Sequence, residues 1–238
     1  MRKFKLIKGT TEYDLMSFQH FFNVPDGLGF DINFSFLRSG ESYIETESSQ
    51  AQKTISGEIV FSSYDKYTEF INFIGDNEKL TLGYMPESTW HYIPVKLASI
   101  TKGELDATKH LICQVQFIAF GTWYTLLNYS GTSAQIQNGA IPSPFRIEVP
   151  GAMTTFTWNI GGLTGKWSGS VTSGQKLVID SNPESMEIAI YNGSTFVSNE
   201  YGNCDFTTER LFFVAPGTQS MTLTKSASVE VRKYAYSV

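Results

Sequence analysis

The residue types that most often carry out catalysis are few in this chain of 238 residues, and their spacing matches no common catalytic motif. The three histidines are His20, His91 and His110, and no two of them stand at the spacing of a metal-binding pair. In the segment Gly165–Gly169 (GKWSG) the serine comes one position too late for the nucleophile elbow of a hydrolase. We therefore expect no metal site and no catalytic serine.

Motifs for cofactor binding and acid–base chemistry are equally weak. The pair Gly27 and Gly29 lacks the third glycine of a dinucleotide fingerprint, and a turn after Pro25 explains it better. The acidic group Glu41, Glu45 and Glu47 reads as a charged, solvated loop rather than as a paired acid and base. The expectation is a protein that is not an enzyme and binds no cofactor.

Two tryptophans in the C-terminal half are the candidate binding residues. Trp158 and Trp167 could stack on a sugar ring, because Tyr and Trp are favoured at binding surfaces as well as in cores. Packing in the core is the alternative, and it applies equally to Trp90 and Trp123.

Cysteines and targeting signals are uninformative about chemistry. Cys113 and Cys204 form no CxxC pattern, so we expect two ordinary buried thiols rather than a zinc site or a redox pair. The N-terminus has no apolar stretch of signal-peptide length, and no window reaches the ~18 apolar residues of a membrane span. The sequence predicts synthesis in a cytoplasm without an export peptide.

The composition describes an acidic, aromatic-rich globular protein. Hydrophobic residues make up 41% of the chain and aromatic residues 14%, which excludes disorder. The 18 basic and 23 acidic residues give a net charge of −5. This net negative charge argues against a protein that binds nucleic acid or an anionic membrane through long-range electrostatic attraction.

The distribution of charge suggests two domains. No Asp, Glu, Lys or Arg occurs from His110 to Phe145, and residues 128–144 are rich in Gly, Ser, Asn and Pro. Such a segment is typical of a linker, so we place a boundary near residue 140 and expect domains at 1–140 and 141–238. The first carries 11 basic and 15 acidic residues (−4), and the second carries 7 and 8 (−1).

The first domain is predicted to be mostly β with one helix. Residues 54–61 alternate apolar and polar, as a half-buried strand does. Apolar residues then follow a helical spacing near 63–74, with Ser62 or Ser63 as the N-cap and Gly75 at the end. Further strands are predicted at Leu80–Tyr84, Tyr92–Ser99 and Leu111–Phe120, with Pro94 at an edge or a bulge.

The second domain is predicted to be a β-sandwich. Short strands separated by Gly, Pro and Asn turns are typical of that architecture. The turn Asn192-Gly193 after an alternating run predicts a hairpin. The predicted strands are Phe145–Val149, Thr154–Ile160, Lys176–Asp180, Glu187–Tyr191, Leu211–Val214, Met221–Thr224 and Val229–Tyr236.

An ordered set of short motifs resembles the distal tail protein (Dit) family of long-tailed bacteriophages. In the first domain these are HFFNVPDGLGFDINFSF (residues 20–36), YDKYTEFINFIG (64–75), LTLGYMPESTW (80–90) and GTWY (121–124). In the second they are PSPFRIEVP (142–150), QKLVID (175–180) and LFFVAPG (211–217).

The resemblance implies a specific architecture and function. It implies an N-terminal β-rich domain that assembles into a homohexameric ring and a C-terminal galectin-like β-sandwich. Such a ring joins the tail tube protein to tail-tip, baseplate or tail-associated proteins and leaves a channel through which DNA passes without specific binding. It also implies a place at the virion tail tip after assembly in the host cytoplasm, with no membrane partner.

One departure limits what the resemblance implies about sugars. Residues 141–238 contain no histidine, whereas sugar-binding galectins resemble one another in a His, Asn, Arg and Trp cluster. We therefore interpret galectin-like as an architecture. The alternative function is a carbohydrate-binding module that attaches the tail to cell-wall sugars through Trp158 or Trp167.

Overall fold

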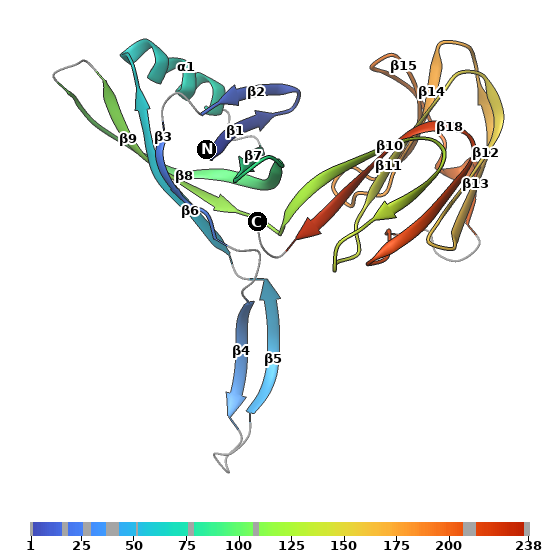
Figure 1. Ribbon diagram of the computed structural model, residues 1–238, viewed down its shortest axis with the longest axis horizontal. Helices are drawn as coiled ribbons and strands as arrows, with labels where there is room; N and C mark the ends of the chain where they lie inside the picture. Colours follow the sequence, from blue (N-terminus) through green and yellow to red (C-terminus); the bar gives the residue numbers. More distant parts are fainter. Residues whose placement is uncertain are drawn as a thin grey trace. The chain divides into compact units, whose positions relative to one another are not determined.

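The computed structural model describes residues 2–15, 19–25, 30–36, 43–50, 52–75, 79–106, 110–206 and 213–235. The fold is mainly β with one α-helix, as expected, and it forms two compact units, Met1–Tyr124 with Tyr236–Val238 and Thr125–Ala235 (Figure 1). Within the described residues no helix is long and apolar enough to cross a bilayer.

The first unit is built on one antiparallel sheet in the order β2-β1-β7-β8-β9-β6-β3. Its elements are β1 (Lys3–Lys8), β2 (Thr11–Asp14), β3 (Gln19–Asn23), β4 (Phe30–Phe36), β5 (Tyr43–Gln50), β6 (Lys53–Phe61), α1 (Tyr64–Ile74), β7 (Leu80–Met85), β8 (His91–Leu105) and β9 (Leu111–Ala119). Strands β4 and β5 pair with each other as a separate two-stranded ribbon (Figure 1).

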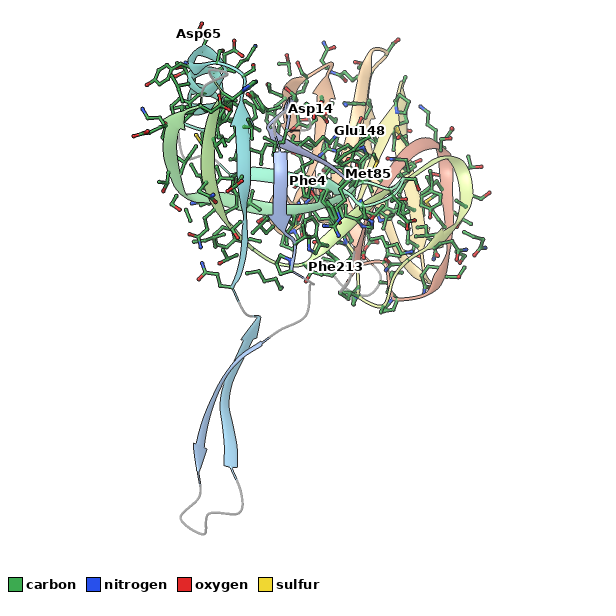
Figure 2. All side chains as sticks on the ribbon, turned by 60° about the vertical axis from the view of Figure 1, so that its left-hand side comes forward. Phe4, Asp14, Asp65, Met85, Glu148 and Phe213 are labelled. Atoms are coloured by element: carbon green, nitrogen blue, oxygen red, sulfur yellow. The ribbon has the colours of Figure 1, made fainter. Side chains whose placement is uncertain are left out.

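Helix α1 confirms the helix that the sequence predicts directly after the alternating strand at 54–61. The Ser63 hydroxyl accepts a hydrogen bond from the Lys66 amide at 3.3 Å, which caps the first turn, and Asp65 follows it (Figure 2). The helix buries Phe70 and Ile74 in the core of the unit. That core takes most of its other side chains from one face of the sheet, since alternate residues of each strand point inward.

Pro94 does not lie at an edge, because β8 has β7 on one side and β9 on the other. The Pro94 carbonyl accepts a hydrogen bond from the Phe120 amide, just beyond the end of β9. In an antiparallel pair the N–H and C=O groups of one residue face the same neighbouring strand. The hydrogen bond that Pro94 cannot donate is therefore lost only at the last residue pair between β8 and β9. The prediction of an edge or bulge is therefore wrong.

The second unit wraps two groups of strands around one core, and β18 belongs to both. Its elements are β10 (Trp123–Gln137), β11 (Phe145–Pro150), β12 (Met153–Ile160), β13 (Leu163–Val171), β14 (Gln175–Asp180), β15 (Glu187–Asn192), β16 (Thr195–Asn199), the 3₁₀ turn η1 (Tyr201–Asn203), β17 (Cys204–Phe206) and β18 (Thr218–Ala235). One path runs β16-β15-β14-β11-β18-β10, and β12, β13 and β17 extend from β18. The hairpin predicted at Asn192-Gly193 joins β15 to β16, with Gly193 at φ 61°.

Part of the predicted linker is a strand. Residues 128–137 form the second half of β10, and the compact units divide after Tyr124, earlier than the boundary expected near residue 140. Tyr129, Ala134 and Ile136 face the core of the second unit, but small and polar residues between them hide the alternation. The composition of residues 128–137 predicts a loop, but pairing with neighbouring strands makes this segment a β-strand.

Other predictions differ from the structure or lie outside the part of the chain that it describes. Strands β13, β16 and β17 were not expected, and the two strands predicted at 221–224 and 229–236 are one continuous strand, β18. Residues 26–29 and 207–212 lie outside the described residues, as do the side chains of the acidic group near residue 45. Residues 26–29 of the PDGLGF motif and the first half of the strand predicted at 211–214 fall there, and Val214 forms an isolated bridge with Ser143.

Glycines in β13 make room for the two large indoles of the core. A Cβ at Gly165 would lie 2.2 Å from the ring of Trp158, its partner on β12, and one at Gly169 would lie 2.5 Å from the ring of Trp167. Such distances are far inside van der Waals contact. Glycine weakens a strand on its own, but here the indoles cover the backbone that it exposes.

Trp167 also holds a buried carboxylate. Its indole N–H donates to Glu200 Oε2 at 3.1 Å, Asn203 Nδ2 donates to the same oxygen, and the Ser198 hydroxyl donates to Oε1. Glu200 is only 7% exposed. Burial opposes ionisation, but the three hydrogen bonds outweigh it, so the pKa of Glu200 lies below its ordinary value.

Gly165→Ala should destabilise the protein by about 1–3 kcal/mol, because the new methyl group overlaps the Trp158 ring and forces the core to shift. Chemical denaturation followed by tryptophan fluorescence measures this. Gly202→Ala is the matched control, since nothing lies within 4 Å of a Cβ there. Equal stability of the two variants would contradict the packing described.

Glu200→Gln should cost about 1–3 kcal/mol at pH 7, because it weakens charge-assisted hydrogen bonds in a buried site. A carboxyl whose folded pKa is lowered stabilises the protein above its unfolded pKa of about 4.3 and loses that contribution as the pH falls through the folded value. Denaturation at pH 7 and pH 3 should therefore show the difference shrinking in acid.

The control is Glu184→Gln at an exposed position, expected to change stability by less than about 0.5 kcal/mol at both pH values. A destabilisation by Glu200→Gln that is the same at pH 7 and pH 3 would show that the carboxylate charge is not what matters.

Candidate functional surfaces

The two tryptophans singled out from the sequence lie inside the second unit. Trp158 and Trp167 are both fully buried, Trp158 stacked on Phe156 with ring centroids 5.9 Å apart. A sugar needs an exposed ring face, which neither residue offers. The structure therefore places both in the packing role. Trp123 is also fully buried and donates to the Pro25 carbonyl at 3.0 Å.

Both cysteines are free thiols. Cys113 is buried in the first unit and Cys204 is half-buried in the second. Burial raises the pKa of Cys113, and burial together with the nearby Glu200 carboxylate raises the pKa of Cys204 to about 12. Thiols with raised pKa values carry little thiolate and react slowly. Among the residues described, no group of three or more His, Cys, Asp or Glu side chains could hold a metal ion.

The most elaborate polar cluster covers β11, β14 and β15. The Arg146 guanidinium contacts Glu148, Asp180 and Glu187 at 3.2, 3.0 and 3.5 Å, and Lys176 contacts Glu148 at 2.7 Å. Figure 2 labels Glu148 within this cluster. Burial opposes the charge on Glu148, yet the hydrogen bonds and charges of Lys176 and Arg146 lower its pKa.

The charges of this cluster largely compensate one another, since Arg146 and Lys176 contact three carboxylates and leave one net negative charge. Asp180 is 5% exposed, and its oxygens accept bonds from Arg146, Ser185 and the Asn182 amide. A cavity of about 120 Å³ beside Arg146 and Asp180 is small, and Arg146 and Ser185 in its lining already donate to Asp180. We interpret the cluster as a clamp across the three strands.

A groove of about 330 Å³ lies on the first unit beside β1, β2 and Trp90. Lys5 lies over the rings of Trp90 and Tyr92, with Nζ 4.7 and 5.5 Å from the centroids, and bonds Glu12 at 2.8 Å. A Cβ at Gly83 would come within 2.9 Å of Lys5 Cγ, so glycine is needed for this stack. Because Lys5 covers the indole, the groove has no free aromatic platform.

The face of β6, β9 and β8 that points away from the core carries mostly uncharged polar side chains. Directly paired residues share a face, so Glu58, Gln114 and Thr101 form one row, and Ser56, Gln116 and Ser99 the next. Gln114 donates to Glu58, and the Ser99 hydroxyl donates to Gln116 at 3.4 Å. These rows are amides and hydroxyls with a single charge.

We call these two rows and the third formed by Thr54, Ile118 and Lys96 the outer face. Its nine side chains carry one carboxylate and one ammonium group, from Glu58 and Lys96. A surface of this kind can contact a polyanion without holding it, because few cations are present to release counterions from phosphates. Sequence reasoning missed this face because it is made from strands far apart in the chain.

Comparison with protein families gives a match that spans about half of the chain. Residues 3–120 match the family described as distal tail protein, N-terminal domain. A comparison with curated protein sequences finds no match.

Two solved phage structures share the fold over nearly the whole chain. A chain of the phage P2 baseplate in its activated conformation with Ca matches with a TM-score of 0.69 and 18% identity over 100% of both chains. The Dit protein of phage SPP1 matches with a TM-score of 0.63 and 9% identity over 97% of this chain and 98% of its own.

At these identities the structures establish the fold, which is that of phage baseplate and tail hub proteins, and the family match comes from the sequence of the first unit. Through its N-terminal domain, the chain belongs to the distal tail protein family.

Proposed function

We propose that this protein is a structural component of the phage tail tip, where it forms a homohexameric ring that joins the tail tube to tail-tip or baseplate proteins. The observation that carries the proposal is the match of residues 3–120 to the distal tail protein domain. The similar SPP1 protein is described as a hub of the adsorption apparatus in phages that infect Gram-positive bacteria. The role is mechanical and needs no catalysis.

The ring would carry its second unit as a galectin-like sandwich and leave a channel for DNA. We assign the lining of that channel to the outer face of β6, β9 and β8. A channel through which DNA slides should not bind phosphates, since each Lys or Arg contact adds affinity and drag. One carboxylate and one ammonium among nine side chains suit this requirement.

The proposed partners follow from the position of such a ring. One side would contact the tail tube protein and the other the tail-tip, baseplate or tail-associated proteins, after assembly in the host cytoplasm. DNA would pass without specific binding, and no membrane contact is involved.

Native mass spectrometry of the purified full-length protein tests the ring. We expect a species with six times the mass of the chain, because a closed head-to-tail contact between six copies satisfies every interface. A protein that stays monomeric at every concentration and does not associate with tail tube protein would contradict the proposal.

Gln116→Lys should slow DNA release from phage particles, most strongly at low salt. The change places a cation in the middle of the proposed lining in every subunit, and added salt weakens its hold on phosphate. The rate of release from purified particles, triggered at low and high ionic strength, is the measurement.

Gln116→Glu is the matched control, because it alters the same exposed side chain and adds the opposite charge; it should leave the rate unchanged. If Gln116→Lys releases DNA as fast as the wild type at both salt concentrations, this face does not line the channel.

A further inference from the structure

The dipeptide Asn-Gly occurs twice in the second unit, and the structure holds the two copies in opposite ways. They are Asn138-Gly139, directly after β10, and Asn192-Gly193, at the turn from β15 to β16. In this dipeptide the backbone can attack its own side chain most readily, because glycine has no Cβ to hinder the approach. In a folded protein the attack depends on how freely the side-chain amide and the following backbone nitrogen can reach each other.

The side-chain amide of Asn138 is buried and fully engaged. Asn138 is 8% exposed, and its Oδ1 accepts a hydrogen bond from the Gly139 amide at 2.8 Å. Its Nδ2 donates to three carbonyl oxygens, those of Val214, Ala215 and Ile141, at 2.9, 3.0 and 3.2 Å. The nitrogen that deamidation would remove therefore connects two segments that are distant in the chain.

The backbone around Asn138 is fixed as well. The Asn138 amide donates to the Gly217 carbonyl at 3.1 Å, and the Gly217 amide donates to the Gly139 carbonyl at 3.0 Å. A Cβ at Gly139 would lie 2.6 Å from the Tyr234 carbonyl oxygen, so the backbone of β18 lies directly against this dipeptide. The chain must open here before the Gly139 nitrogen can reach the side-chain carbon of Asn138.

Asn192 has none of these restraints on its side chain. Asn192 and Gly193 are exposed, and within the described part of the chain the side-chain amide of Asn192 makes no hydrogen bond. Gly193 has a φ of 61°, and nothing lies within 4 Å of the position of a Cβ there. Asn192 pairs with Thr195 at the tip of a hairpin whose second strand, β16, is the last in the strand order. Such tips open at a low cost in free energy.

We propose that Asn192 is a site of spontaneous deamidation, whereas the fold protects the same dipeptide at Asn138. The Gly193 backbone nitrogen gives up its proton to a solvent base and attacks Cγ of Asn192. The side-chain nitrogen takes a proton from water and leaves as ammonia, which closes a five-membered cyclic imide. Water then opens either carbonyl of the imide and leaves aspartate or isoaspartate at this position. The net reaction consumes water and releases ammonia.

The modification would change the chemistry of this hairpin. Both products add a carboxylate to an exposed turn, and isoaspartate also adds a backbone atom between β15 and β16. The longer backbone would shift the pairing of Tyr191 with Phe196, whose ring centroids lie 5.9 Å apart. The inference concerns the second unit alone and does not depend on the ring proposed above.

Peptide mapping of the full-length protein by mass spectrometry tests the difference between the two sites. The folded protein is incubated in mildly alkaline buffer, and samples are digested briefly at acidic pH, where deamidation is slow. The peptide with Asn192 should gain the mass difference between an amide and an acid and separate into two products of equal mass. The peptide with Asn138 should react about a hundredfold more slowly, since its amide must first break three hydrogen bonds.

Incubation of the unfolded chain in guanidinium chloride is the control for sequence, because both dipeptides are then free and should deamidate at similar rates. Asn192→Gln is the matched variant, since glutamine must close a larger ring, and it should leave this turn unmodified under the same conditions. The proposal is wrong if Asn138 reacts as fast as Asn192 in the folded protein. It is equally wrong if Asn192 stays intact in the folded protein while it reacts in the unfolded chain.

Discussion

The first unit depends on the pairing of β9 with β6. The register is unbroken over nine residue pairs, from Lys53 with Ala119 to Phe61 with Leu111. Alternate residues of β9, among them Cys113, Val115 and Phe117, enter the core, and the residues between them face solvent. A shift by one residue would exchange the two faces completely, so this pairing fixes the core and the outer face together. The proposed channel lining is a consequence of that register.

The second unit has a corresponding constraint in the stacking of indoles on glycines. Trp158 and Trp167 each occupy space that a Cβ at Gly165 or Gly169 would fill, and Trp167 in turn helps to hold the carboxylate of Glu200. Trp158 and Trp167, which the sequence suggested as ligand-binding residues, therefore hold β12, β13 and η1 together in one core.

Local signals in the sequence were enough for much of the fold. The alternation in residues 54–61, the helical spacing after Ser63 and the turn at Asn192-Gly193 each depend on neighbours in the chain, and the structure has all three. β10 and β13 were missed because Gly, Ser and Thr hide their alternation, although β13 pairs with β12, which directly precedes it in the chain. The outer face could not be predicted for the same reason: its rows combine residues from 54–58, 96–101 and 114–118.

The central claim is that the chain forms a ring around the DNA path with the outer face of β6, β9 and β8 toward the lumen. A cryo-EM reconstruction of the purified tail, resolved well enough to trace strands, tests it most directly. Our account predicts six copies of the first unit at the distal end of the tube, with Gln114 and Gln116 facing the channel. Density for the chain elsewhere in the particle, or a ring whose lumen is formed by another face, would contradict it.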